Sequence, residues 1–279
     1  MKIALSAEST VDLPKQILEQ FGVNIIPFNV LLGEQEFKDD GTLTNQDLFD
    51  FVKKTGVLPK TAAISTYDYE EHFTSLLTRF DAIIHFSLSE HLSSVYQNAV
   101  NAAKMNENIV VINSQSLSTG IALLVLSASE KIKQNKTLKQ IETEILDEIP
   151  RVKASFVLDT LSYMHKGGRC SAVALLGANL LKIKPQIVLS GGKMTVGKKY
   201  RGKQEDVLVK YTEEILAENN PDKSKVFITY SSSPKALEAV VEKVKAFGFE
   251  NVYITQAGAT ICSHCGPETL GVLFINKGW

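Results

Sequence analysis

The sequence predicts an α/β protein built from two α/β domains. Short apolar runs that suit buried strands recur between amphipathic helical segments along almost the whole chain, and this alternation is typical of α/β folds. The 279 residues, of which 44% are hydrophobic, suffice for two separate cores. We therefore expect an N-terminal domain of residues 1–150 with a largely parallel sheet and a C-terminal domain of residues 151–279 with a mixed sheet.

The first half alternates strands with helices. Strands are expected at residues 2–6, 24–32, 81–86 and 108–113. Helices are expected at about 14–22, after a capping box formed by Thr44 and Asp47, around Phe73 and Leu76, within residues 92–103, at about 118–133 and from Leu138 to Ile149. Residues 58–66 are expected to form a loop. The strand, helix and strand of residues 81–113 make a βαβ unit, whose two strands are parallel.

The second half begins after Pro150 and Arg151, which suit a domain boundary. Residues 183–201 contain Gly191–Gly192 between two strand-like runs, so we expect a hairpin and therefore antiparallel pairing in this half. The other expected elements are strands at 155–160, 225–230, 251–256 and 271–276, a helical turn before residues 166–170, an apolar helix at 172–181, a helix after Gly202, and a helix from Leu237 to Val244.

Charge and composition limit the classes of partner and the cellular compartment that we expect. A formal net charge of −1 provides no field to hold a polyanion, so nucleic acid is not an expected partner. No run approaches the roughly 20 apolar residues that cross a bilayer, and the N-terminus becomes polar too early for a secretory signal. Three cysteines fit a reducing compartment. We expect a cytoplasmic protein without stable membrane insertion.

Polar loops at the expected strand ends suggest where a ligand binds. Open α/β sheets bind ligands where strands end and loops enter helices. Thr61 and Ser65 lie in one such loop, Ser93 and Ser94 in the next, and His264 follows a strand near the end of the chain. Hydroxyls, helix-opening amides and one imidazole can hold a single carboxylate or phosphate by hydrogen bonds. Serine and threonine are also the usual helix N-caps, so each hydroxyl has a purely structural alternative.

The segment KGGRC, residues 166–170, offers a second candidate. Its two glycines allow a close backbone approach, and Arg169 can grip a phosphate or carboxylate with two hydrogen bonds. Gly-Gly after a short helix is equally an ordinary helix terminator. The chain contains neither the G-x-x-x-x-G-K-[ST] pattern nor a G-x-S-x-G elbow, so neither ATP binding by this chain alone nor a common serine hydrolase is supported.

The segment ICSHCGPETLG, residues 261–271, allows three interpretations. Cys262 and Cys265 form a C-x-x-C pair that suits redox chemistry or a metal, although no second ligand pair completes a zinc site. Alternatively, the working group is His264, presented by a turn at Gly266–Pro267. The third interpretation is plain packing. The residues alone do not decide between these three interpretations.

The ordered set of motifs resembles the DegV family of bacterial proteins over essentially the whole length. AESTVDLP is similar to the family's D-S-T-x-D-L-P, LPKTAAIS to P-x-T-S-Q-P-S, and SLSEHLSSVYQNA to I-S-S-G-L-S-G-T-Y-Q-S-A. INSQSLSTG is like I-D-S-x-S-x-S-x-G, KGGRCS like K-G-G-R-I-S, and SHCGPETLG like H-T-G-P-G-x-L-G. This chain departs from those patterns at Glu8, Ala62, Ala63, Ile64, Ser94, Val95, Cys265 and Glu268.

The resemblance implies a fold, a ligand and a partner. It implies two α/β domains that meet at a ligand cleft, and a carrier without catalytic residues of its own. Such a carrier binds a long-chain fatty acid as ligand, with no other cofactor. It presents the carboxylate to a separate ATP-dependent fatty acid kinase subunit, which makes an acyl phosphate for phospholipid synthesis.

The resemblance also implies roles for particular residues. The carboxylate contacts fall on Thr61, Ser93 and His264, and Arg169 supports phosphoryl transfer. His264 is then the functional group of its segment, Cys262 and Cys265 are packing neighbours, and no metal is expected. Further ligand-site candidates are Ser65, Ser94 and Gly266. The acyl tail is expected between helices 118–128 and 172–181. The alternative function is a hydrolase or phosphotransferase with Ser93 as nucleophile and His264 as base.

Overall fold

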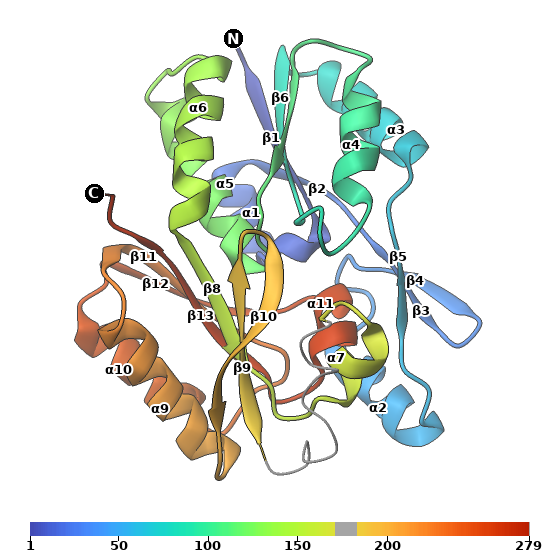
Figure 1. Cartoon of the computed structure of the whole chain (residues 1–279). Coiled ribbons are helices and arrows are strands. Elements are labelled where there is room, and N and C mark those ends of the chain that lie inside the picture. The colour runs from blue at the N-terminus through green and yellow to red at the C-terminus, as the bar shows by residue number, and fades with distance from the viewer. Residues whose placement is uncertain (171–182, 279) are drawn as a thin grey trace.

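The computed structural model describes residues 1–170 and 183–278 and shows an α/β protein with two main sheets (Figure 1). A four-stranded sheet in the N-terminal part has the order β2-β1-β6-β7, and all its pairings are parallel. Its strands are β1 (Ile3–Glu8), β2 (Val23–Ile26), β6 (Ala82–Ser87) and β7 (Ile109–Asn113). The prediction of a parallel N-terminal sheet is confirmed.

Helices cover both sides of this parallel sheet. In Figure 1, α3 and α4 lie on one side and α5 and α6 on the other. The helices of this part are α1 (Lys15–Phe21), α2 (Asn45–Thr55), α3 (Thr66–Leu77), α4 (Val95–Ala103), α5 (Thr119–Lys133) and α6 (Leu138–Glu148), with the 3₁₀ turns η1 (Ser9–Val11) and η2 (Ile149–Arg151). Helix α1 begins after Pro14 and ends at Gly22, as predicted, and Thr44 caps α2 by accepting from the Asp47 amide.

A six-stranded mixed sheet dominates the C-terminal part and has the order β10-β9-β8-β13-β11-β12. Only β11 and β12 are parallel to each other, which confirms the predicted mixed sheet. The hairpin at Gly191–Gly192 is also confirmed. The strands are β8 (Val152–Val157), β9 (Lys184–Ser190), β10 (Lys193–Tyr200), β11 (Pro221–Tyr230), β12 (Asn251–Gln256) and β13 (Leu270–Asn276), and the helices are α7 (Ser162–Gly167), α9 (Gln204–Ala217), α10 (Leu237–Phe247) and α11 (Ala259–Cys265).

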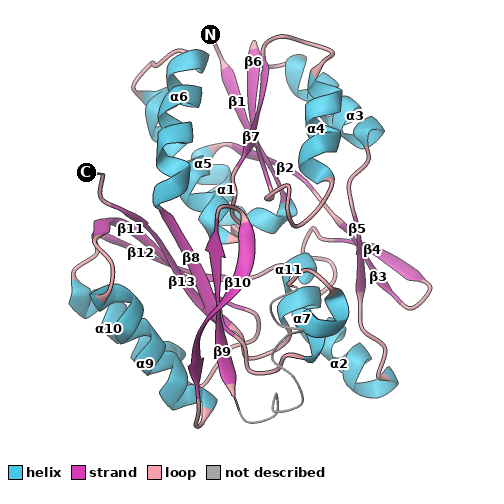
Figure 2. Cartoon of the chain, viewed as in Figure 1, coloured by secondary structure: helices cyan, strands magenta, loops and turns pink. Residues whose placement is uncertain are grey.

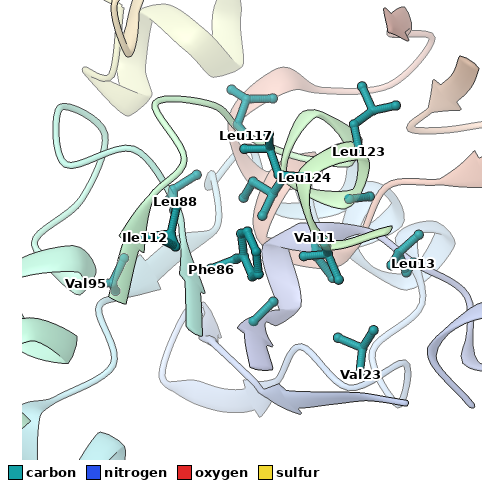
Figure 3. Packing of buried hydrophobic residues seen from close by; sticks show 14 of the residues in the cluster. Val11, Leu13, Val23, Phe86, Leu88, Val95, Ile112, Leu117, Leu123 and Leu124 are labelled. Atoms are coloured by element: carbon teal, nitrogen blue, oxygen red, sulfur yellow. The ribbon is translucent and has the colours of Figure 1, made fainter. Parts of the chain in front are cut away.

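Helix α5 joins the two sheets. It packs against β1 and β6 of the parallel sheet and against β8, β11 and β13 of the mixed sheet. Every residue from Thr119 to Ser129 is buried, as expected for a helix that is apolar all round. Figure 3 shows Leu123 and Leu124 of this helix, with Leu117 before it, among the side chains of the same apolar cluster. The largest core therefore includes residues from both sheets. No helix within residues 1–170 and 183–278 is long and apolar enough to cross a membrane.

Three short elements differ from the sequence prediction. The single strand expected at residues 24–32 is two strands, β2 and β3, separated at Pro27, which has no amide to donate to a sheet. A small antiparallel sheet, visible at the right of Figure 2, includes a strand within the expected loop 58–66. Its order is β4 (Gln35–Lys38), β3 (Asn29–Leu32) and β5 (Lys60–Ala62).

The third difference lies near the C-terminus, where helix α11 (Ala259–Cys265) was not predicted, although the predicted turn at Gly266–Pro267 directly follows it. The helix expected at residues 172–181 lies outside the described residues. A domain boundary at residue 150 remains a prediction.

Candidate functional site

A mostly apolar cavity is lined by loops of the parallel sheet, by strands of the mixed sheet and by helix α11. Its volume of about 190 Å³ far exceeds the roughly 10–15 Å³ that one water molecule occupies on the same measure. The loops that follow β1, β6 and β7 form part of its wall, so it lies at the carboxyl ends of parallel strands. The apolar lining side chains include Phe28, Leu88, Leu92, Leu117, Phe156, Met164, Met194, Ile261 and Leu273.

Helix α11 forms one wall and carries His264. Its N-cap residue, Gly258, has no side chain with which to cap the helix. Asp39 does so from a distance, because its carboxylate accepts from the amides of Ala259 (2.8 Å) and Thr260 (3.2 Å). A carboxylate at this end also interacts favourably with the helix dipole. The N-terminal part of the chain therefore fixes the helix that carries the imidazole.

A second buried carboxylate supports the same helix. Asp12 accepts from the Gly258 amide (2.7 Å) and from the Ser118 hydroxyl (2.5 Å). Asp12 and Ser118 both have positive φ, at 53° and 52°, and their hydrogen bond helps to hold this uncommon backbone. Burial raises the pKa of Asp12 to about 8, against the opposing effect of these two donors.

His264 lies at the meeting point of three elements. Its Nε2 hydrogen-bonds Thr61 Oγ1 of β5 at 2.9 Å. A Cβ on Gly167 would lie 2.9 Å from its Nδ1, so the glycine at the end of α7 leaves the room that the imidazole needs. Burial, and then the positive charge of Arg169, lower the pKa of His264 to about 4. At neutral pH the ring is therefore uncharged, and it can donate one hydrogen bond and accept another.

Two serines from the loop before α4 also line the cavity. Ser93 is half-buried, and Ser94 is exposed at the N-cap position of α4, where its side chain makes no cap hydrogen bond. Neither hydroxyl is hydrogen-bonded to another side chain or backbone group within the described part of the chain. The helix-opening amides behind them add further neutral donors. This corner suits one anionic group held by uncharged donors.

Arg169 lies at the exposed edge of the cavity. Its guanidinium donates to the Gly167 carbonyl at 2.8 Å, so it stays beside the glycine that packs against His264. It contributes a positive charge next to a site whose other polar groups are neutral. The structure thus brings Thr61, Ser93, Ser94, Arg169 and His264 to one cavity.

Ser65 and Gly266 do not line this cavity. The Ser65 hydroxyl donates to the Asp68 carboxylate and accepts from the Asp68 amide, so it caps α3. Gly266 ends α11 with a φ of 76°, and a Cβ there would lie 2.7 Å from the Tyr163 ring. Gly266 thus ends the helix that carries His264, whereas Ser65 caps a helix that contributes no residue to the cavity. Ligand contact by either one remains a prediction.

The two cysteines of α11 are buried in its packing. Cys262 Sγ faces the Ala257 carbonyl at 3.5 Å, and Cys265 Sγ faces the Gly266 carbonyl at 3.5 Å. Burial, together with the neighbouring Cys265, raises the pKa of the Cys262 thiol, which disfavours the reactive thiolate. Among the described residues, His, Cys, Asp and Glu side chains nowhere gather in a group of three or more that would hold a metal ion.

Several residues that organise the site escaped the sequence analysis. Asp39 follows β4 in KDDG, and Asp12 lies in STVDLP, but nothing near them in sequence indicates which helix they cap. Thr10 and Thr260, which also line the cavity, look like ordinary surface or cap residues. One local sign of such a distant cap was Gly258 at the N-cap of α11. A glycine has no side chain to accept from the first amides of the helix, so another residue must do so.

Comparison with known proteins agrees with this fold and places the chain in a family. A family model for DegV proteins matches residues 2–277. A DegV domain-containing protein of Halalkalibacterium halodurans is 30% identical over 97% of both chains, and one of Caldanaerobacter subterraneus is 26% identical over 99% of both.

Solved structures show the same fold. A DegV family protein of Thermus thermophilus, described by its fatty acid binding, is 26% identical with a TM-score of 0.92, covering 99% of this chain and 100% of its own. DegV of Bacillus subtilis, described as a fatty acid binding protein, is also 26% identical, with a TM-score of 0.86 and the same coverage. The family expectation from the motifs is confirmed: this chain belongs to the DegV family.

Proposed function

We propose that this protein binds a long-chain fatty acid and presents its carboxylate to a separate ATP-dependent kinase subunit. The kinase converts the bound acid to an acyl phosphate, which feeds phospholipid synthesis in the cytoplasm. The observation that carries the proposal is the hydrogen bond between Thr61 and His264 at an apolar cavity, with Ser93 in the same lining. The fatty acid binding described for the Thermus thermophilus and Bacillus subtilis relatives supports this choice of ligand.

The apolar walls suit the tail of such a ligand. Each buried methylene contributes roughly 0.8 kcal/mol, so a 16-carbon tail supplies roughly 12 kcal/mol before ordering costs. Burial of the tail therefore dominates the affinity. The polar corner then has only to orient the head group.

Neutral donors suit a carboxylate that must later react. Because burial and the charge of Arg169 lower the pKa of His264 to about 4, the imidazole meets the acid as an uncharged hydrogen-bonding group at neutral pH. Thr61, Ser93 and His264 can hold the carboxylate by hydrogen bonds and leave one oxygen free to attack the γ-phosphoryl group of ATP in the partner. The surrounding walls also keep water from the labile acyl phosphate.

Arg169 fits a role at the interface with the kinase. It is exposed at the edge of the cavity, close enough to His264 to lower the imidazole's pKa. A guanidinium there can stabilise negative charge that builds up during phosphoryl transfer. We propose that this residue assists the transfer and contributes little to retention of the tail.

The test is to extract the purified protein with organic solvent and to identify any released lipid by mass spectrometry. One fatty acid per chain is the expected result, and a lipid-free protein that also fails to take up stearate would contradict the proposal. Incubation with the kinase and ATP should then yield acyl phosphate. Arg169→Ala should keep its fatty acid but give at least tenfold less product, and unchanged turnover would remove its proposed role.

The hydrolase alternative receives less support from the geometry. A serine nucleophile needs its base within hydrogen-bond reach, but His264 Nε2 is paired with Thr61, and no Ser93–His264 hydrogen bond occurs among the described residues. Covalent labelling of Ser93 by an activated fluorophosphonate in the lipid-free protein distinguishes the two functions. The carrier should show none.

A further inference from the structure

Two threonines that line the cavity have hydroxyls without a partner. Thr10 lies in η1 and is 0% exposed, and Thr260 lies in the first turn of α11 and is 3% exposed. Neither Oγ1 atom makes a hydrogen bond within residues 1–170 and 183–278. Buried hydroxyls are nearly always paired in folded proteins. Two such atoms on one cavity wall therefore indicate a missing polar partner.

Other hydroxyls in the same lining are satisfied within the protein. Thr269 Oγ1 donates to the Cys265 carbonyl at 3.0 Å. Thr229 Oγ1 lies 2.6 Å from Thr119 Oγ1 and 3.0 Å from Thr255 Oγ1. The buried threonines of this lining therefore differ, because Thr229 and Thr269 are paired within the protein whereas Thr10 and Thr260 are not.

The Asp39 carboxylate links the Thr260 amide to the side chain of Ser9, the residue before Thr10. Asp39 Oδ2 accepts from the Ser9 hydroxyl at 3.0 Å and from the Thr260 amide at 3.2 Å. Thr10 follows Ser9 directly, and η1 packs against α11. The two hydroxyls therefore belong to one region of the wall, where their positions are fixed by the framework.

This region lies close to the corner that holds the carboxylate in the proposed function. Thr260 and His264 are four residues apart on α11, and both line the cavity. Positions i and i+4 share a helix face and are separated by about 6 Å along the axis. A ligand atom that meets Thr260 is accordingly only a few carbons away from a carboxylate held by His264.

We propose that the cavity recognises fatty acids that carry an oxygen substituent a few carbons from the carboxyl group, with Thr10 and Thr260 as the hydrogen-bonding pair. This inference rests on the proposed function. A plain methylene chain leaves both hydroxyls unpaired, whereas a hydroxyl group both donates and accepts and so satisfies the two threonines together. The pair acts as a specificity determinant for the acyl chain near its head.

The test compares stearate with 3-, 5- and 12-hydroxystearate on the delipidated full-length protein. Displacement of a fluorescent fatty acid gives each Kd. The 3- or 5-hydroxy acid should bind about tenfold more tightly than stearate, which is the scale of one or two net hydrogen bonds. The 12-hydroxy acid should show no gain, because its oxygen lies beyond the reach of both threonines.

Matched variants assign any preference to the two hydroxyls. Thr10→Val and Thr260→Val, each made singly, should reduce the ratio of the stearate Kd to the hydroxystearate Kd, and Thr260→Ser should retain that ratio. Thr269→Val is the control, because the Thr269 hydroxyl already serves the Cys265 carbonyl. That variant should keep the preference even where its thermal stability falls.

The outcomes separate this inference from the proposed function. If stearate binds and neither 3- nor 5-hydroxystearate binds more tightly, the inference fails and the carrier function stands. A preference that survives in both valine variants, or a gain confined to 12-hydroxystearate, also overturns it. If none of the acids binds, both proposals fail together.

Discussion

Buried polar groups serve opposite purposes beneath the parallel sheet and around the cavity. Under the sheet, the fully buried Glu8 carboxylate accepts from Tyr69 (2.6 Å), from His85 (3.1 Å) and from the Leu88 amide (2.9 Å). Burial alone raises its pKa, but the charge of His85 and these donors outweigh burial, so the pKa of Glu8 is lowered overall. Around the cavity, by contrast, the buried polar side chains are mainly hydroxyls and one neutral imidazole.

The difference shows where this fold tolerates a buried charge. Glu8 ends β1, and its bond to the Leu88 amide fixes the start of the loop that carries Ser93. The Glu8 carboxylate thus keeps its charge because its hydrogen-bond donors are fixed parts of the fold. Uncharged donors line the cavity in which, under the proposed function, the fatty acid binds. Substitutions at Glu8 and around the cavity test these two arrangements separately.

The largest expected effect comes from removing the charge beneath the sheet. Glu8→Ala leaves the Tyr69 hydroxyl, His85 and the Leu88 amide without their acceptor, so the free energy of unfolding should fall by about 3–5 kcal/mol. Urea denaturation measures the change. The exposed Glu19→Ala is the control and should change stability by less than about 0.5 kcal/mol. Equal losses in the two variants would mean that the network contributes little.

The neutral imidazole of His264 should make the free energy of unfolding decrease at low pH. The pKa of His264 falls from 6.5 to about 4 on folding, so between these values the unfolded chain binds more protons, and stability decreases as pH falls. Relative to a His264→Gln variant, the protein should lose about 3 kcal/mol more between pH 6.5 and 4. Urea denaturation of both proteins across this range measures the difference. Parallel curves would contradict a neutral His264.

Asp12 should act in the opposite direction at higher pH. Its pKa is raised from 3.8 to about 8 by burial, so the folded state holds an extra proton, and stability decreases as pH rises through that range. Between pH 6.5 and 8 the loss should be about 2 kcal/mol. Asp12→Asn, which cannot ionise, should flatten this part of the stability curve. Thermal unfolding at both pH values provides the comparison.

Removing the distant cap of α11 should affect both stability and binding. Asp39→Ala frees the amides of Ala259 and Thr260 and should cost about 1–2 kcal/mol, as loss of an N-cap does. Because α11 carries His264, fatty acid retention should weaken as well. Within the described part of the chain, the exposed neighbour Asp40 hydrogen-bonds Thr42 of its own turn and no other residue, so Asp40→Ala should leave retention unchanged. Equal retention in the two variants would remove the positioning role of Asp39.

The smallest expected effects concern the head-group hydroxyls themselves. Ser93→Ala should weaken retention of the fatty acid by about tenfold without loss of stability, since one net hydrogen bond is removed and the tail stays buried. Ser65→Ala is the matched control. That hydroxyl caps α3 outside the cavity, so the variant should lose stability and keep its affinity. Loss of affinity in Ser65→Ala with unchanged affinity in Ser93→Ala would contradict the roles assigned to the two serines.

Sequence patterns predicted the long elements because their signals are local. The parallel βαβ unit, the apolar helix α5 and the hairpin at Gly191–Gly192 each follow from periodicity or turn residues within one short segment. Strands β3, β4 and β5 are too short for a period to show. Helix α11 was missed because it has only 7 residues and its cap, Asp39, lies 220 positions away.

Part of the candidate site was predicted because its residues lie in short motifs that can be recognised locally. Thr61, Ser93, Ser94, Arg169 and His264 were chosen from motifs, and the structure brings all of them to one cavity. Their contacts with a ligand remain predictions. Local spacing could not indicate that Gly167 makes room for the imidazole or that Thr10 meets the same wall as Thr260, because both relations join segments far apart in the chain.

The position of β13 has a consequence for biosynthesis. This last strand pairs with β8 on one side and β11 on the other, in the middle of its sheet, and α11 just before it rests on Asp12 and Asp39. Domains form from the N-terminus while a chain is translated. Asp12 and Asp39 are therefore synthesised long before the helix that they hold, and the wall of the cavity is complete only after residues 259–276 have emerged from the ribosome.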